Sequence, residues 1–183
     1  MASARTRIHS FSPLANPDAR ILILGSMPGR ASLAAYQYYA HPQNSFWRIM
    51  AQLLHTEATL PYEQRVDGLT SAGIAVWDVL QSCFREGSLD AKIESDTLLA
   101  NDFRSFFQTH PKISHVFFNG AKAEACFRRH VLHELEQVPL VYLRLPSTSP
   151  ANAGITYASK LKDWQSILPP LMNHPEPLSR PRK

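Results

Sequence analysis

The stretch ILILGSMPGRASLAAYQYYAHPQNSFWRIM occupies residues 21–50 and decides how the chain folds. It opens with an apolar run, Ile21 to Leu24, whose lack of polar alternation predicts a strand buried on both faces. The run ends in the turn GSMPG at residues 25–29. Open α/β sheets bind ligands beyond the carboxyl ends of such strands, so this turn is the first candidate for a functional site.

Two common phosphate-binding motifs are absent from this turn. A P-loop requires glycine, four further residues and then Gly-Lys-Ser/Thr, but Arg30 stands where the second glycine is needed. The dinucleotide fingerprint Gly-x-Gly-x-x-Gly also fails, because the glycines stand at 25 and 29. The turn is followed instead by a dense run of rings and amides, YQYYAHPQNSFW at residues 36–47.

The rest of the chain alternates between apolar runs and amphipathic segments. We predict strands at 19–25, 74–80, 113–119 and 140–145, and helices at about 44–55, 62–72, 101–109, 121–136 and 157–168. Residues 1–18 are expected to be irregular and 85–90 to form a polar loop. The expected fold class is therefore α/β, a three-layer α/β/α sandwich around a four-stranded parallel sheet.

Composition indicates one domain with a short tail. The chain has 183 residues, 44% hydrophobic and 19% charged, which suits a single domain at 1–168. Residues 169–183 hold five prolines and a basic end, so we predict a disordered tail there. The sequence has no signal-peptide pattern and no apolar run of membrane-spanning length, so we expect no membrane association and a cytoplasmic monomer.

Charge and cysteine content restrict the partners and cofactors. A formal net charge of +4 and a pI near 9.2 are compatible with a polyanionic partner, although many basic proteins bind none. We expect Cys83 and Cys126 to be buried thiols, and two cysteines cannot supply the four thiolates of an iron–sulfur cluster. No His/Cys cluster has zinc spacing, so we expect neither a metal nor a cofactor.

A family resemblance rests on two blocks, GSMPG at 25–29 and YYAHPQNSFW at 38–47. Together they resemble motif 1 of the uracil-DNA glycosylase superfamily, most of all its hypoxanthine-DNA (deoxyinosine) glycosylase branch. The similarity spans roughly residues 21–168. Other branches carry Asn or Asp inside the turn, where this chain has Ser26. The hypoxanthine branch shares that loss and uses a downstream Asn instead, which matches Asn44.

The resemblance implies roles for residues of the motif. Asn44 would be the catalytic residue, because its carbonyl can hold an attacking water; its position alone also suits a helix N-cap. Tyr39 matches the ring that stacks on the flipped base, with a core aromatic as the alternative. The base pocket would further include the backbone of the turn, at Gly25, Ser26, Met27 and Pro28.

Two later segments are candidates for base and DNA contacts. Asp78 lies near the end of an apolar run, where it either caps the backbone or accepts the N1–H of hypoxanthine. The loop at 146–154 is either a generic surface loop or a DNA contact. In the second interpretation hydroxyls bind phosphate oxygens, and the following residues lie where the superfamily inserts a wedge into the duplex. The residues concerned are Ser147, Thr148, Ser149, Pro150, Ala151 and Asn152.

The resulting hypothesis is a monofunctional DNA-deoxyinosine glycosylase. It would hydrolyse the N-glycosidic bond of a flipped deaminated base, hypoxanthine first, in double- or single-stranded DNA, and would leave an abasic site. Lyase chemistry through a Schiff base needs a lysine nucleophile, and residues 1–91 contain no lysine. Two alternatives remain open: a uracil- or mismatch-specific glycosylase, and a non-catalytic DNA-binding α/β module.

Overall fold

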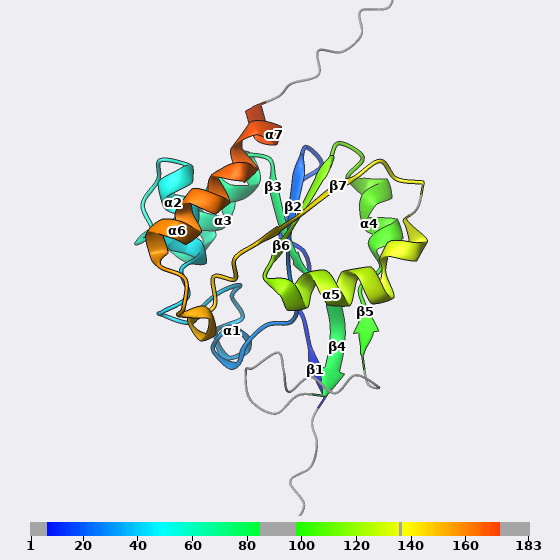
Figure 1. The fold of residues 1–183 in the computed structure, drawn as a ribbon, viewed down its shortest axis with the longest axis horizontal. Coiled ribbons are helices and arrows are strands. Elements are labelled where there is room, and N and C mark those ends of the chain that lie inside the picture. Colours follow the sequence, from blue (N-terminus) through cyan, green and yellow to red (C-terminus); the bar gives the residue numbers. More distant parts are fainter. Residues whose placement is uncertain (1–6, 85–97, 136, 173–183) are drawn as a thin grey trace, which may run out of the picture.

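The computed structural model describes residues 7–84, 98–135 and 137–172 (Figure 1). Its centre is a sheet of four parallel strands in the order β3-β2-β6-β7. These strands are β2 (Ile21–Gly25), β3 (Ile74–Asp78), β6 (His115–Asn119) and β7 (Val141–Leu145). All five residues of β2 and of β3 are buried, as the apolar runs predict.

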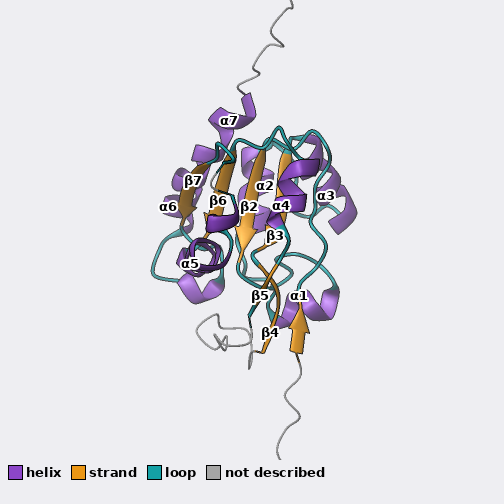
Figure 2. Cartoon of the chain, turned by 90° about the vertical axis from the view of Figure 1, so that its right-hand side faces the viewer, coloured by secondary structure: helices purple, strands orange, loops and turns teal. Residues whose placement is uncertain are grey.

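Alternate residues of β2 belong to the two halves of the core. Ile21 and Ile23 face one apolar cluster, while Leu22 and Leu24 face the other, because successive side chains of a strand point to opposite faces. Helices α2, α3 and α6 cover the first face, and α4 and α5 cover the second (Figures 1 and 2). The predicted three-layer α/β/α fold is therefore confirmed.

Seven α-helices lie within the described residues. They are α1 (Arg30–Ala35), α2 (Phe46–Leu53), α3 (Tyr62–Ser71), α4 (Phe103–Thr109), α5 (Ala121–His130), α6 (Tyr157–Trp164) and α7 (Leu168–Met172). Helix α1 was not predicted, because six residues directly after the turn are too few to show a helical period. The helix predicted at 121–136 is shorter, since α5 ends at His130 and a 3₁₀ turn follows at Leu132–Glu134.

A second, smaller sheet was also missed. Its strands β1 (Arg7–His9), β4 (Leu80–Phe84) and β5 (Leu99–Ala100) pair antiparallel in the order β1-β4-β5. The strand predicted at 74–80 ends at Asp78, and the chain enters β4 directly afterwards. Strands of two or three residues carry no readable alternation, so only pairing with β4 defines them. The loop predicted at 85–90 lies outside the described residues.

The packed part of the chain extends past residue 168. Helix α7 occupies Leu168–Met172, and Nη1 of Arg20 donates a hydrogen bond to the carbonyl of Leu171 at 3.0 Å. Helical structure thus continues to Met172, past the boundary expected at 168/169, and residues 173–183 lie outside the described part. Cys83 and Cys126 are buried and form no disulfide with each other, as predicted. Within the described ranges, no helix is both long and apolar enough to cross a membrane.

Candidate active site

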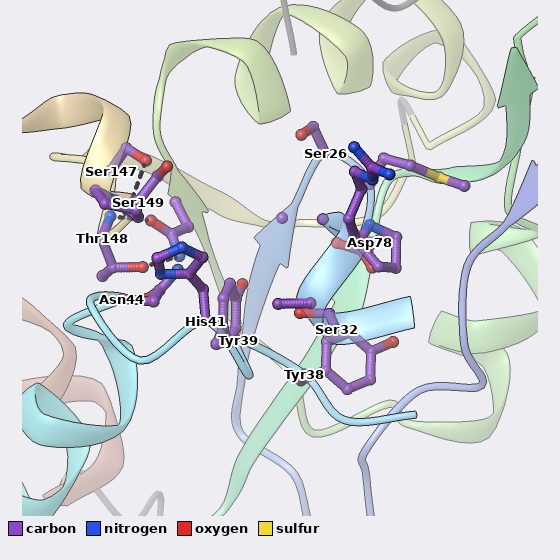
Figure 3. A pocket seen from close by; sticks show the side chains of 18 residues that line it. Ser26, Ser32, Tyr38, Tyr39, His41, Asn44, Asp78, Ser147, Thr148 and Ser149 are labelled. Carbon is purple, nitrogen blue, oxygen red and sulfur yellow. Dashed lines mark hydrogen bonds between the residues drawn. The ribbon is translucent and has the colours of Figure 1, made fainter. Parts of the chain in front are cut away.

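A cavity of about 140 Å³ opens beyond the carboxyl ends of the parallel strands (Figure 3). Every strand of the parallel sheet leads into it. The turn 25–29 follows β2, Asp78 ends β3, Asn119 ends β6, and residues 147–150 follow β7. The remaining walls come from the start of α1 and from the segment that carries Tyr38, Tyr39, His41 and Asn44. Most of the predicted site residues thus meet at one place.

Gly25 leaves room for two polar side chains, those of Asp78 and Tyr39, to lie against the backbone of β2. It pairs with Asp78 in the parallel register of β2 and β3. A Cβ atom at position 25 would overlap Oδ1 of Asp78 and lie 3.2 Å from the hydroxyl oxygen of Tyr39. The carboxylate and the phenol therefore occupy the space that any side chain at residue 25 would fill.

Asp78 is a buried carboxyl on the cavity wall, with 3% of its surface exposed. Its backbone carbonyl accepts a hydrogen bond from Nδ2 of Asn101 at 2.8 Å, which holds the end of β3 in place. The pKa of Tyr38 is raised, first because the ring is buried and then because the charge of Asp78 is near. Tyr38 therefore keeps its proton, and it donates that proton to the carbonyl of Ser12 at 3.1 Å.

The ring of Tyr39 rests on a fixed aromatic support. It stacks on Phe46, with ring centroids 4.0 Å apart and an interplanar angle of 28°. Its backbone has a left-handed φ of 55°, an uncommon conformation for a residue other than glycine. The preceding peptide is held by hydrogen bonds from Tyr38 N–H to the Tyr62 hydroxyl and from Trp47 Nε1–H to the Tyr38 carbonyl. The cavity wall at Tyr39 is therefore rigid, and its stacking on a base stays a prediction.

Asn44 lines the cavity and directly precedes the N-cap of α2, while its catalytic role stays a prediction. Its Oδ1 accepts a hydrogen bond from the N–H of Phe46 at 3.0 Å, at the start of α2, while the side chain lines the cavity. The N-cap residue is Ser45 and α2 begins at Phe46, so the helix start predicted at about 44 is two residues early. A carbonyl oxygen has two lone pairs, so the bond to Phe46 orients Oδ1 and leaves a second acceptor position for water.

The loop after β7 is held by Asn119. The N–H of Thr148 donates to Oδ1 of Asn119 at 2.8 Å, and Nδ2 of Asn119 donates to the Thr148 hydroxyl at 2.9 Å. Thr148 is 1% exposed, so its hydroxyl is turned inward and not toward a phosphate, in contrast to the prediction. Ser147, Ser149 and Pro150 line the cavity.

The predicted wedge residues lie at the edge of this loop. Pro150–Asn152 form a 3₁₀ turn, and Ser149 Oγ accepts the N–H of Ala151 at 3.2 Å. Ala151 and Asn152 do not line the cavity. Asn152 Nδ2 donates to the carbonyl of Ser147 at 3.1 Å, and this bond connects the end of the 3₁₀ turn to the start of the loop.

Comparison with known proteins identifies the family. The family model of the Uracil DNA glycosylase superfamily matches residues 12–182. The chain belongs to the uracil DNA glycosylase superfamily. A curated relative from Methanosarcina acetivorans, named Hypoxanthine DNA glycosylase, is 36% identical over 158 residues, which are 86% of this chain and 95% of the relative. One of the same name from Methanosarcina barkeri is 36% identical over 114 residues, 62% of this chain and 71% of that one.

A solved structure shows the same fold. It is a solution NMR structure from Methanosarcina acetivorans, described as a candidate uracil DNA glycosylase. Its TM-score to this chain is 0.77 at 30% identity, and the match covers 92% of this chain and all of the other. The α/β fold of the superfamily therefore extends over nearly the whole of this protein.

Some cavity residues of this superfamily member were not selected from the sequence. They are Gly29, Arg30, Ala31, Ser32, Tyr38 and His41, together with Asn119, which we expected mainly to end a strand. A position at the carboxyl end of a central strand was a usable signal for Asn119. No such signal exists for Ser32, because its burial depends on helix α1, which was not predicted. In the structure its Oγ accepts the N–H of Ala40 at 3.2 Å. Among the described residues, no three His, Cys, Asp or Glu side chains gather as metal ligands.

Proposed function

We propose that this protein is a monofunctional DNA glycosylase that removes hypoxanthine from DNA and leaves an abasic site. One observation carries the proposal. The amide of Asn44 and the carboxyl of Asp78, 34 positions apart in the sequence, line one cavity of about 140 Å³ beyond the strand ends. Two relatives named Hypoxanthine DNA glycosylase support hypoxanthine as the base.

Asn44 positions the attacking water. Loss of the base passes through an oxocarbenium-like sugar, as in glycoside hydrolysis, so the water needs placement more than full deprotonation. The bond from Phe46 N–H orients Oδ1 of Asn44, whose second lone pair accepts a hydrogen from the water. The water oxygen bonds to C1′ of the sugar, and the glycosidic bond breaks with its electron pair on the base. One proton of the water ends on the base, which leaves as neutral hypoxanthine.

The opposite wall binds the base. Tyr39, supported by Phe46, offers a ring on which a base stacks, and such stacking contributes about 1–3 kcal/mol for any base. Asp78 accepts the N1–H of hypoxanthine. Adenine has a bare N1 at that position and is repelled by the carboxylate, which is a physical basis for selectivity. Backbone N–H groups of the turn 25–29 stabilise the charge that develops on the leaving base.

The loop after β7 contacts the DNA backbone. Ser147 and Ser149 line the cavity and are the hydroxyls we assign to phosphate oxygens. Pro150, Ala151 and Asn152 extend from them as the wedge that fills the space of the flipped base. A deaminated base pairs weakly, so it flips at lower cost than a normal one. We further propose that the protein acts as a cytoplasmic monomer on double- or single-stranded DNA.

The decisive experiment uses matched DNA duplexes with one deoxyinosine or one deoxyuridine. After incubation, alkali cleaves the strand wherever a base has been removed. We expect cleavage at deoxyinosine under single-turnover conditions, and at least about a hundredfold lower rate for Asn44→Ala, with lesion binding retained. Faster cleavage at deoxyuridine would favour a uracil glycosylase, since the N3–H of uracil also suits Asp78. Cleavage at neither lesion would favour a DNA-binding module without catalysis.

A further inference from the structure

Thr148 is the most deeply buried of the polar residues that line the cavity. Its exposed fraction is 1%, against 3% for Asp78 and 6% for Ser32. Both of its bonds to Asn119 run to one side-chain amide, which accepts the Thr148 N–H and donates to the Thr148 hydroxyl. One residue at the end of β6 thus holds both the backbone and the side chain of Thr148.

The carbonyl of Thr148 extends the connection to a third element. It accepts hydrogen bonds from the N–H of Ser45 at 3.1 Å and from the Ser45 hydroxyl at 3.3 Å. Ser45 is the N-cap of α2 and directly follows Asn44, whose Oδ1 accepts the N–H of Phe46. Thr148 therefore lies between the end of β6 and the peptide that carries Asn44, bonded to both.

Close packing leaves this loop little room to shift against β6. Gly120 has a left-handed φ of 99°, and a Cβ atom there would lie 2.9 Å from Cβ of Ser147. The N–H of Gly120 also donates to the carbonyl of Leu145 at 3.0 Å. Ser147 and Ser149 are the chain neighbours of Thr148, and both line the cavity.

We propose that Thr148 is a positioning residue that joins Asn44 and the loop serines 147 and 149 into one rigid unit. DNA seated on the loop then sets where Asn44 holds the water. Thr148 touches neither the base nor the water and acts through Ser45. This inference rests on the proposed glycosylase function for its role in excision, but the hydrogen-bonded connection itself is independent of that function.

The first test compares Thr148→Val with Thr148→Ser. Valine removes the hydroxyl that accepts from Asn119 and keeps the shape, whereas serine keeps the hydroxyl. At saturating deoxyinosine DNA we expect Thr148→Val to lower the single-turnover rate about three- to tenfold, as one lost hydrogen bond allows, and more than it weakens DNA binding. Thr148→Ser should stay within about twofold of the wild-type rate. A wild-type rate for Thr148→Val would overturn the proposal.

Thr70→Val is the matched control. The Thr70 hydroxyl likewise takes part in a hydrogen bond, here as the donor to the carbonyl of Val66 at 3.0 Å, but it lies in α3 and not at the cavity. We expect it to leave the excision rate unchanged. If Thr70→Val slows excision as much as Thr148→Val, general destabilisation explains both, and the positioning role is wrong. Ser45→Ala, which removes only the 3.3 Å bond, gives a second variant should Thr148→Val fold poorly; a wild-type rate there also counts against the role.

A measurement without DNA separates this inference from the proposed function. The amide proton of Ser45 bonds to Thr148, so its hydrogen exchange, followed by NMR, reports the connection directly. We expect exchange at Ser45 to be about three- to tenfold faster in Thr148→Val and unchanged in Thr70→Val. Unchanged exchange in Thr148→Val would overturn the inference even if the wild-type protein removes hypoxanthine. Faster exchange would support the connection even if no lesion is excised.

Discussion

The two edges of the parallel sheet gather different residues. At the carboxyl edge, the continuations of all four strands line a cavity of about 140 Å³. At the amino edge, a groove of about 530 Å³ lies between the end of α4 and the residues before β7. Its lining, which includes Arg104, Phe107, Pro111, His133 and Val138, comes from helix surfaces and connections and contains no strand residue. Both hollows carry polar side chains, but only the cavity at the carboxyl edge takes its lining from the ends of all four parallel strands.

Gly25→Ala should lower the excision rate the most, because it disturbs the cavity at the carboxyl edge directly. The new Cβ would overlap Oδ1 of Asp78 and press on the Tyr39 hydroxyl, so one wall of the cavity must shift. A shift of about 1 Å in such a site can cost about a hundredfold in rate. We expect that loss in single-turnover excision of hypoxanthine. An active Gly25→Ala protein would show that the cavity at the carboxyl edge is not the catalytic site.

The next effect concerns the base-reading role of Asp78. Removing a hydrogen bond to a charged group costs about 1.5–3 kcal/mol, so Asp78→Ala should slow hypoxanthine excision roughly ten- to a hundredfold. Asp78→Asn should retain part of the activity and lower the barrier against adenine, since a flipped amide can donate to a bare N1. Excision rates on deoxyinosine, deoxyuridine and normal DNA, with the thermal midpoint of each variant, test this. Parallel loss of both lesion activities together with lower stability would indicate a structural cap.

A smaller effect compares one arginine from each edge. Arg30 is exposed and lines the mouth of the cavity, whereas Arg104 lines the groove at the amino edge. We expect Arg30→Ala to weaken DNA binding a few-fold and to reduce the log–log salt slope by about 0.9, the contribution of one neutralised phosphate. Arg104→Ala should change neither quantity. Equal effects of the two substitutions in a salt titration would contradict DNA binding at one edge.

The smallest effect is expected for Gly68→Ala, which serves as the control for Gly25→Ala and should increase the stability of the protein. Gly68 lies inside α3, away from the cavity, and a Cβ added there meets nothing within 4 Å. Because alanine favours helix over glycine, Gly68→Ala should stabilise the protein by about 0.5–1 kcal/mol and leave excision unchanged. Denaturant unfolding measures the first quantity and the single-turnover assay the second. A loss of activity would show that α3 is coupled to the cavity.

Long buried strands were the most predictable part of this chain. Residues 21–24 and 74–77 are apolar without alternation, and burial on both faces follows directly from that composition. The small sheet was not predictable, because β1 and β5 consist of three and two residues and exist only through pairing with β4. Helix α1 and the early end of α5 likewise depend on neighbours that the local sequence does not specify.

The candidate site divides in the same way. The residues of motif 1, with Asn44 and Tyr39, could be selected because they stand together within residues 25–47. Asp78 could be selected as a carboxylate in an apolar run. The burial of the Thr148 side chain could not be predicted, since its serine- and threonine-rich surroundings are typical of a surface loop. Its burial results from Asn119, which lies 29 positions earlier in the chain.

The α/β class, the central strand and the types of groups available for the chemistry all follow from the local sequence. Hydrophobic periodicity and turn residues act over a few positions, so they can be read locally. Which of these groups meet depends on the folded chain: Asp78 and Tyr39 approach each other beside Gly25, and Thr148 bonds to both Asn119 and Ser45. Those contacts join residues tens of positions apart, and their geometry exists only once parallel strands align their ends at one edge of the sheet.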